Sequence, residues 1–555
     1  MDKNEISENK EILNEETKSS NASSQTMLKG ATILAAAALV TKVFGAVFRI
    51  PLTNMIGAEG QSYYTVAYNI YTLLFVIATA GIPVAISRMV SSRIAEKDYI
   101  NAHKSYKLAL KVSSVLGCLA FLILFFGAGF IARSYNIPGA EPSIRALSFA
   151  MLLTPAQSSF RGYYQGRQEM LPTGLSEVVE QMIRVVVGLS LAYMFYKSSL
   201  EMAAAGATFG ASAGVTAALI VMIIIYLRDK SKRSALMADS IERAEDDSSR
   251  LKELLAYLIP VTIGAAVLPI MFNIDSAMVV RRLMATGWDR VTAQKLFGLM
   301  GGYCDPIINL PSVFTDAICI SLMPAITTAY TLKNKDELNK QLRTGLKTMM
   351  IIAYPCTIGL MVLARPILTM LFFKQHDEAL MAVPTLQILS LLIVMGAIMR
   401  TFATSLQGIG HMMLPVRNLF IGVLIKAVVS YLLLGVYSIN INGAPIGTVI
   451  AHITAAILNY LSLRKYVDVE IDVKTVFWKP LLSALIMGAA TIAVYKLIFM
   501  ALGSNTVATF AAIMAAVIVY FVTLFKTKAM TKEEVELVPK GDVIYRLAVK
   551  LKIAE

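Results

Sequence analysis

The chain has 555 residues, of which 56% are hydrophobic and only 16% are charged, and its mean hydropathy is +0.63. This composition excludes an ordinary soluble domain, because a stretch of about 20 apolar residues can cross a bilayer and the chain contains many such stretches. The net charge of +14 does not indicate a nucleic-acid partner, because the basic residues lie in short loops between apolar runs, as in polytopic membrane proteins.

The N-terminal residues 1–26 are rich in Glu, Asn, Ser and Lys and contain little that could be buried. This composition predicts a disordered tail. The segment lacks a basic start followed by an apolar core, so no cleavable signal peptide is predicted. The four cysteines lie in apolar runs, which favours small apolar helix residues over a disulfide framework or a metal site.

Fourteen apolar segments follow, which predicts an all-α integral membrane protein with 14 transmembrane helices. Most loop Lys and Arg residues follow even-numbered segments, with 281–295 as the main exception. Those loops, and with them both termini, are therefore expected in the cytoplasm. The predicted segments are 28–51, 63–88, 107–132, 145–164, 173–196, 203–227, 254–280, 297–325, 346–372, 384–407, 416–437, 444–463, 477–500 and 505–525.

Several polar landmarks occur twice, about 240 residues apart in the chain. The clearest is a turn that reads Gln-Gly, a few polar positions and then Met-Leu, with a proline after it and a cation farther along the next segment, Arg184 in one copy and Lys426 in the other. Because six spans return the chain to the same side, segments 1–6 and 7–12 are interpreted as parallel repeats. The paired landmarks are 163–172 with 405–415, Pro83 and Lys97-Asp98 with Pro324 and Lys335-Asp336, and 206–210 with 443–447.

The repeat predicts two six-helix lobes around a central cavity, followed by two further helices, with substrate bound between the lobes. A mixed-charge stretch is interpreted as the linker between the lobes. The predicted parts are a disordered cytoplasmic tail (1–26), an N-terminal lobe (27–227), a cytoplasmic linker (228–252), a C-terminal lobe (253–464), two C-terminal helices (465–526) and a cytoplasmic tail (527–555).

Ionisable residues inside membrane spans are costly, and they tend to face a cavity. Arginine and lysine suit phosphate, so cations in spans indicate a cavity for an anionic head group. Snorkelling to an interface or an internal salt bridge is the alternative. Lys42 and Arg49 are two helical turns apart and therefore share a face. The substrate-binding candidates are Lys42, Arg49, Arg88, Arg184, Arg400 and Lys426, together with Glu180, which can pair with Arg184 at i,i+4.

Oxygen-bearing residues in segments 7 and 11 suggest a coupling site. Asp275 and Asn273 offer ligands for a small hard cation such as Na⁺, or a proton site, and Asn418 could add an oxygen. The alternative for Asp275 is a salt bridge to another helix. No other cofactor is predicted, since the sequence shows no Walker A motif and no His/Cys metal cluster.

Several stretches resemble the polysaccharide-transport family, in the branch that holds stage V sporulation protein B and the MurJ-like lipid II flippases. The resemblance covers residues 28–525. It implies two lobes forming a V, two extra helices lining a hydrophobic groove, and alternating access that moves an undecaprenyl-diphosphate-linked sugar to the outer leaflet of the bacterial plasma membrane. The stretches are Gly30-Ala-Thr-Ile-Leu, Thr41-Lys-Val-Phe-Gly, Phe48-Arg-Ile-Pro51, Gly81-Ile-Pro-Val-Ala-Ile-Ser87, Gly162-Tyr-Tyr-Gln-Gly-Arg-Gln-Glu-Met-Leu-Pro-Thr173 and Glu177-Val-Val-Glu-Gln-Met-Ile-Arg184.

The resemblance also implies roles for individual residues. Cations of segments 1, 2 and 8 line the cavity in MurJ-type members, and the pair in segment 1 together with Arg88 matches the first two positions. Segment 8 departs from the pattern, because Cys304-Asp305-Pro306 stands where an arginine is expected, so Arg400 or Lys426 would have to substitute. Some relatives bind sodium through an acid of segment 7, for which Asp275 is the match.

The predicted function is therefore a flippase for a lipid-linked cell-wall precursor, with lipid II as the first candidate, and not an enzyme. Expected partners are the lipid-linked oligosaccharide, membrane lipids and cell-wall synthesis proteins. The processes in which the protein is expected to act are peptidoglycan synthesis, sporulation or the maintenance of cell shape. The alternatives are an exporter of another lipid-linked glycan, a cation-coupled drug antiporter of the same superfamily, a membrane enzyme that polymerises lipid-linked sugars, and a non-transporting scaffold for wall assembly.

Overall fold

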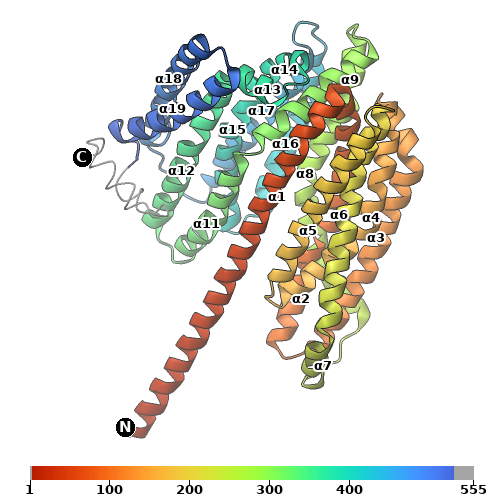
Figure 1. Cartoon of the computed structure of the whole chain (residues 1–555). Helices are drawn as coiled ribbons and strands as arrows, with labels where there is room; N and C mark the ends of the chain where they lie inside the picture. Colours follow the sequence, from red (N-terminus) through yellow and green to blue (C-terminus); the bar gives the residue numbers. More distant parts are fainter. Residues whose placement is uncertain (1–2, 531–555) are drawn as a thin grey trace. The chain divides into compact units, whose positions relative to one another are not determined.

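The protein, as seen in a computed structural model that describes residues 3–530, is built from helices joined by short turns (Figure 1). No strand occurs in this described part of the chain. Within residues 3–530, twelve helical stretches are long and apolar enough to cross a membrane. The predicted class of an all-helical, multi-pass membrane protein is therefore confirmed, whereas most of the predicted tail 527–555 lies outside the described residues.

Helix α1 (Lys3–Thr79) explains part of the difference between twelve stretches and fourteen predicted segments. It continues through a kink at Gly57 (φ 61°, ψ −170°), so the first two predicted segments form one stretch, Val40–Ala95. The segment predicted at 145–164 is present as α4 (Glu141–Gly166), but it is not among the twelve. The helix also begins at Lys3, which differs from the disordered tail expected from composition; Glu and Lys have good helix propensity.

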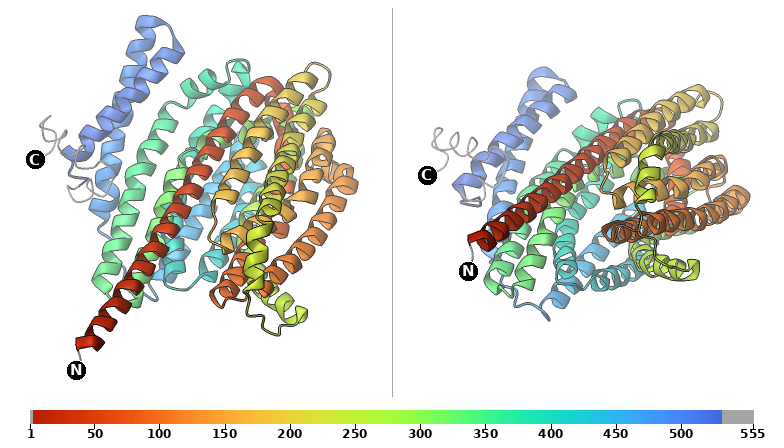
Figure 2. Two further views of the ribbon diagram at one scale, coloured as in Figure 1. Left: turned by 60° about the horizontal axis from the view of Figure 1, so that its bottom comes forward. Right: turned by 90° about the horizontal axis from the view of Figure 1, so that it is seen from below.

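The first of two compact units contains the described residues up to Phe48, together with Val66–Arg133 and Pro138–Pro269. In it, α6 packs against α4 and α5, and α2 packs against α4 (Figures 1 and 2). The linker predicted at 228–252 contains α7 and belongs to this unit. Its further helices are α2 (Ile82–Ala95), α3 (Tyr99–Ser134), α5 (Leu171–Phe195), α6 (Leu200–Arg228), α7 (Lys230–Ala238) and the first part of α8 (Asp247–Ala285).

The second unit contains Arg49–Thr65, Ser134–Ile137 and the described residues from Ile270 onward. Here α17 packs against α15 and α16, and α11 packs against α15, which is the order of neighbours in the first unit. Helix α18 packs against α12 and α19. The helices are α9 (Arg290–Gly298), α10 (Asp305–Ile308), α11 (Ser312–Thr331), α12 (Lys335–Val362), α13 (Ala364–Leu371), α14 (His376–Met381), α15 (Val383–Gly408), α16 (Met413–Leu434), α17 (Gly443–Leu463), α18 (Lys479–Leu502) and α19 (Asn505–Lys526).

The repeated Gln-Gly turn has the same backbone geometry in both units. The helix before it ends at Gly166 or Gly408, and the second residue after that glycine has a positive φ, 61° at Gln168 and 92° at Gly410. Helices α5 and α16 then begin at matching positions. The main-chain hydrogen bonds also match: Arg167 N to Tyr163 O and Glu169 N to Tyr164 O in one copy, Ile409 N to Ser405 O and His411 N to Leu406 O in the other.

A second repeated turn corrects the register predicted from sequence. Lys97 (φ 58°) is followed by Asp98, which caps α3, and Lys333 (φ 53°) is followed by Asn334, which caps α12. The pairing of Lys97-Asp98 with Lys335-Asp336 is therefore wrong by two residues. The cap is set by the residue that follows the positive-φ position, and Asn serves as well as Asp there.

Candidate functional site

A buried ion pair links two helices of the second unit. Lys426 Nζ in α16 lies 2.6 Å from Asp275 Oδ2 in α8, and the two residues are 0% and 2% exposed. The sequence suggests separate roles for them, in substrate binding and in coupling, whereas the structure has the salt bridge that was the alternative for Asp275. Asp275 Oδ1 accepts no hydrogen bond from the described residues. The carboxylate is thus half satisfied in a buried position.

Two further charges are linked to this pair, because Asp305 lies within electrostatic range of it and Arg49 lies within range of Asp305. Arg49 in α1 donates a hydrogen bond from Nη1 to Gly301 O (2.7 Å), and its guanidinium lies 4.7 Å from the centre of the Tyr64 ring. Asp305, the first residue of α10, lies within electrostatic range of Arg49 and of the buried ion pair. We call Arg49, Asp275, Asp305 and Lys426 the charge cluster. The sequence marks Asp305 only as a departure from the expected arginine, although an acid in an apolar run was a usable signal.

A π-helical turn, Leu299–Cys304, holds Arg49 and directly precedes Asp305. Such a turn displaces main-chain carbonyls from regular helical bonding and often occurs at functional sites. Here Gly301 O accepts from Arg49, and Gly302 O accepts from Thr53 Oγ1 (3.2 Å). Glycine is required for this approach, because a Cβ on Gly301 would lie 2.3 Å from Thr65 Oγ1. The predicted continuous segment 297–325 is therefore broken into α9, the π-turn, α10 and α11.

The two asparagines predicted to assist Asp275 lie apart from one another. Asn273 accepts a hydrogen bond from Tyr135 OH (3.3 Å). Asn418 lies eight residues before Lys426, about 12 Å along α16 at 1.5 Å per residue. Its side-chain amide donates to Asn459 Oδ1 (2.9 Å) in α17 and to a serine of α17. Within residues 3–530, no group of three or more His, Cys, Asp or Glu residues could hold a metal ion.

The first unit has its own polar group around Arg184. Its Nη1 donates to Tyr68 OH (3.0 Å), and the guanidinium lies over the rings of Tyr68 and Phe48. Glu180 accepts from Arg161 Nη2 (2.9 Å) and also from a glutamine of α4. The carboxylate that was predicted to pair with Arg184 at i,i+4 thus forms a salt bridge with a cation of α4.

Arg184 and Lys426 occupy matching places in the two units. A Cβ on Gly210 would lie 2.6 Å from Arg184 O, and a Cβ on Gly447 would lie 3.2 Å from Lys426 O. Small residues let neighbouring helices approach closely, and the same close approach is used in both helix pairs. The repeated turn therefore leads to a cation at the same helix–helix contact in each unit, as the sequence spacing predicts.

The remaining predicted cations differ in their exposure. Lys42 in α1 is partly buried. Arg88 is exposed, with its guanidinium 4.5 Å from the centre of the Tyr257 ring. Arg400 forms an ion pair with Asp316, and both side chains are at least one-third exposed. Arg88 and Arg400 are accordingly the more accessible of these groups.

A carboxylate that no sequence pattern marks as important holds the kink in α1. Glu378 Oε2 accepts hydrogen bonds from Ala58 N (2.7 Å) and from Tyr303 OH (2.5 Å). Ala58 follows Gly57, whose φ and ψ are confined almost entirely to glycine. Asn54, one turn earlier, donates to Leu371 O (2.8 Å). The kink is thus fixed by groups that lie more than 300 residues later in the chain.

The helices are long and apolar enough to cross a membrane, they are broken at glycine and proline, and they hold charges inside their spans. These features are typical of a polytopic membrane transporter. Similar solved structures show the same fold. "Lipid II flippase MurJ, inward closed conformation" has a TM-score of 0.63 at 16% identity and covers 89% of this chain and 98% of that one. An inward-facing multidrug resistance MATE family transporter of the MOP superfamily has a TM-score of 0.63 at 15% identity, covering 77% of this chain and 94% of that one.

The chain belongs to the polysaccharide biosynthesis protein family, whose sequence profile matches residues 27–330, and a MatE profile matches residues 300–432. Three Bacillus subtilis (strain 168) proteins are similar. The uncharacterized membrane protein YabM is 30% identical over 520 residues, 92% of this chain and 95% of its own length. The lipid II flippase MurJ is 28% identical (84% and 88%), and stage V sporulation protein B is 24% identical (95% and 99%). The resemblance stated from the sequence motifs is therefore confirmed, and the family is one of transporters rather than enzymes.

Proposed function

We propose that the protein is a flippase that moves an undecaprenyl-diphosphate-linked cell-wall precursor from the inner to the outer leaflet by alternating access. The observation that carries the proposal is the charge cluster, which holds two cations and two acids among membrane-spanning helices of a chain similar to a lipid II flippase. Lipid II is the first candidate substrate. Another lipid-linked glycan is the second, since the relatives also include a sporulation protein.

The proposal includes an arrangement of fourteen spans in two six-helix lobes, with two further helices after them. Division of Val40–Ala95 at the Gly57 kink and inclusion of α4 would raise the twelve apolar stretches to fourteen. The basic loops support the proposal that both termini lie in the cytoplasm. The similarity to a Bacillus subtilis flippase supports a bacterial plasma membrane as the location. Cell-wall synthesis proteins are proposed as partners because the chain is similar to a lipid II flippase.

Four cations of the apolar spans would bind the diphosphate, and the buried pair would couple transport to an ion or to the membrane potential. Lys42, Arg49, Arg88 and Arg184 are the proposed diphosphate ligands, since arginine and lysine form charge-assisted hydrogen bonds to phosphate oxygens. Asp275 is the proposed coupling acid. Protonation of its carboxylate, or Na⁺ binding to it, would weaken its hold on the Lys426 ammonium group and bias the helices that carry the pair.

A complementation experiment tests the proposed ligands. In a strain depleted of its own flippases, Lys42→Ala and Arg49→Ala should abolish growth while the variant proteins still reach the membrane. Lys295→Ala, in the short helix α9 just before the π-turn, is the control and should support growth. Growth of the Lys42→Ala and Arg49→Ala variants at the wild-type rate would contradict the assignment of these residues.

Reconstitution tests the substrate. Liposomes that contain the purified protein should translocate labelled lipid II faster than protein-free liposomes, and a sodium gradient should alter the rate if Na⁺ is the coupling ion. Other undecaprenyl-linked sugars in parallel reactions separate lipid II from another glycan. The MatE match favours one further candidate, a cation-coupled drug antiporter. Drug resistance on expression, without any translocation of lipid-linked sugars, would favour that candidate.

A further inference from the structure

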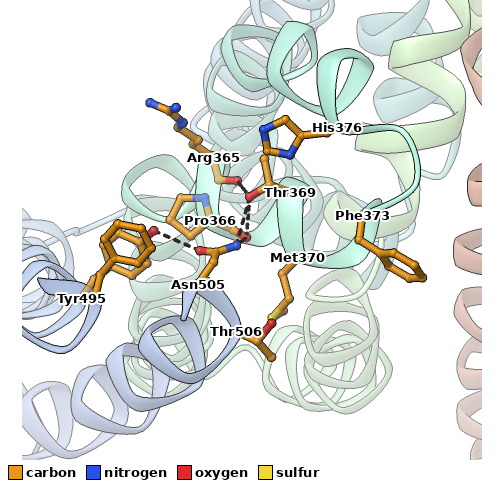
Figure 3. A pocket seen from close by; sticks show the side chains of 10 residues that line it. Arg365, Pro366, Thr369, Met370, Phe373, His376, Tyr495, Asn505 and Thr506 are labelled. Atoms are coloured by element: carbon orange, nitrogen blue, oxygen red, sulfur yellow. Dashed lines mark hydrogen bonds between the residues drawn. The ribbon is translucent and has the colours of Figure 1, made fainter. Parts of the chain in front are cut away.

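A cavity of about 610 Å³ lies between α13 and the α18–α19 hairpin in the second unit (Figure 3). It is distinct from the charge cluster, with which it shares no lining residue. One set of lining groups is apolar or aromatic, including Met370, Phe373 and Phe499. The other set is polar and includes Arg365 and Asn505. The cavity is therefore amphipathic, and it is large enough for a small head group with its first methylene groups.

The helix ends place the cavity at the boundary between membrane and water. Arg365 is the second residue of α13, which follows the end of α12 at Val362. Asn505 is the first residue of α19, directly after the turn that ends α18. Around this level, α18 and α19 expose large apolar side chains such as Met500 (74% exposed) and Phe510 (59% exposed). A bilayer places its phosphate groups at such span ends and its acyl chains beside such apolar faces.

A network of hydrogen bonds fixes the wall of the cavity. Asn505 Nδ2 donates to Pro366 O and to Thr369 Oγ1, both at 3.1 Å, and Asn505 Oδ1 accepts from Tyr495 OH at 3.0 Å (Figure 3). The amide therefore joins α13, α18 and α19. A site that is already formed loses less free energy when its ligand binds than one that must first be ordered.

The cation at the rim identifies the ligand class. Arg365 is exposed, and its guanidinium makes no ion pair with any residue from 3 to 530 for which contacts are described. A guanidinium presents a fork of N–H donors that matches phosphate oxygens. Among the described residues that line the cavity, Arg365 is the one Lys or Arg. One full positive charge complements the single negative charge of a phosphodiester better than the higher charge of a diphosphate.

We propose that this cavity binds the head group of an anionic glycerophospholipid of the surrounding bilayer. The phosphodiester would accept hydrogen bonds from Arg365, the glycerol end would lie beside Thr369 and Tyr495, and the first acyl carbons would contact Met370 and Phe373. The bound lipid would join α13 to the α18–α19 hairpin and stabilise their packing. This inference does not depend on the substrate that the protein transports.

The test measures lipid binding to the full chain purified in detergent. Phosphatidylglycerol should raise the thermal midpoint of the wild type and should be retained in native mass spectra, whereas phosphatidylcholine should do so much less. Arg365→Gln should weaken phosphatidylglycerol binding about tenfold or more, the effect of losing a charged hydrogen-bond donor. Met370→Trp, which keeps the arginine and fills the apolar side, should also weaken it.

Lys496→Gln is the matched control. Lys496 is an exposed cation of α18 that does not line the cavity, and its loss should leave phosphatidylglycerol binding unchanged. Equal weakening by Lys496→Gln would indicate general charge attraction and overturn the site. Equal retention of phosphatidylcholine, displacement of phosphatidylglycerol by millimolar inorganic phosphate, or preference for undecaprenyl phosphate would each overturn the assignment of the ligand.

Discussion

Lys426 and Asp275 form a buried ion pair, with Nζ and Oδ2 2.6 Å apart on α16 and α8. Removal of one member leaves an uncompensated buried charge, which typically costs about 3–5 kcal/mol. We therefore predict that Asp275→Asn or Lys426→Met strongly lowers the thermal midpoint of the detergent-solubilised protein. The double variant, which removes both charges, should recover part of the loss.

The exposed pair of Glu141 with Arg145 provides the control for that prediction. Its atoms lie 2.9 Å apart, but the arginine side chain is 52% exposed. Such pairs contribute about 0–1 kcal/mol, so Glu141→Gln should barely move the midpoint. Equal effects of Glu141→Gln and Asp275→Asn would contradict the view that burial gives the Lys426–Asp275 pair its importance.

The sequence predicts the features of this protein that depend on local patterns. Apolar runs predict the helices, and the repeated Gln-Gly turn predicts two turns with matching main-chain hydrogen bonds, each followed by a cation at the same helix contact. The repeat register fails at Lys335-Asp336 because the cap at Asn334 depends on the positive φ of the residue before it. Residue identity alone does not reveal that conformation.

Partner choice across the chain is the part that could not be predicted. Asp275 finds its lysine 151 residues later, and Glu378 reaches the amide of Ala58 320 residues earlier. Glu180 forms a salt bridge with Arg161 of another helix. These contacts are set by how helices pack, and a single sequence contains the charges but not the distances between them.

The capping residues of the repeated α2–α3 and α11–α12 turns offer a matched pair for stability measurements. Asp98 accepts from Asn101 N (3.0 Å), from Asn101 Nδ2 (2.7 Å) and from Arg243 N (3.2 Å). Asn334 accepts from Glu337 N (3.0 Å). Loss of an N-cap typically costs about 0.5–2 kcal/mol. We predict that Asp98→Ala lowers the thermal midpoint more than Asn334→Ala, because it also leaves buried donors without partners.

Only the Asp98 effect should depend on pH. Burial alone would raise the pKa of Asp98, but hydrogen bonds from Asn101 and Arg243 lower it below its ordinary value. A depressed folded-state pKa stabilises the protein above the unfolded value of about 3.9, and this contribution is lost as the pH falls through the folded value. The midpoint difference between wild type and Asp98→Asn should thus shrink below about pH 4, while that of Asn334→Ala stays constant.

The kink in α1 predicts a specific change in hydrogen exchange. The amide of Ala58 donates to Glu378 Oε2, and hydrogen bonds to charged groups contribute about 1.5–3 kcal/mol. If this bond protects the amide, Glu378→Gln should speed exchange at Ala58 by about tenfold or more. Asp377→Asn, at the exposed neighbouring position, is the control and should leave that rate unchanged. Unaltered protection in Glu378→Gln would show that the kink does not depend on the carboxylate.

The repeated Gln-Gly turn offers two substitutions that should change the thermal midpoint in opposite directions. Gln168 has φ 61° and Gly410 has φ 92° at matching positions. A side chain in the left-handed region costs roughly 1–2 kcal/mol, and glycine avoids that cost. Gln168→Gly should therefore raise the thermal midpoint and Gly410→Ala should lower it, in the same assay. A Cβ on Gly410 would have open space around it, so a lower midpoint of Gly410→Ala cannot be attributed to a steric clash of the new methyl group. Destabilisation by both substitutions would mean that the Gln168 side chain makes contacts whose value exceeds the backbone strain.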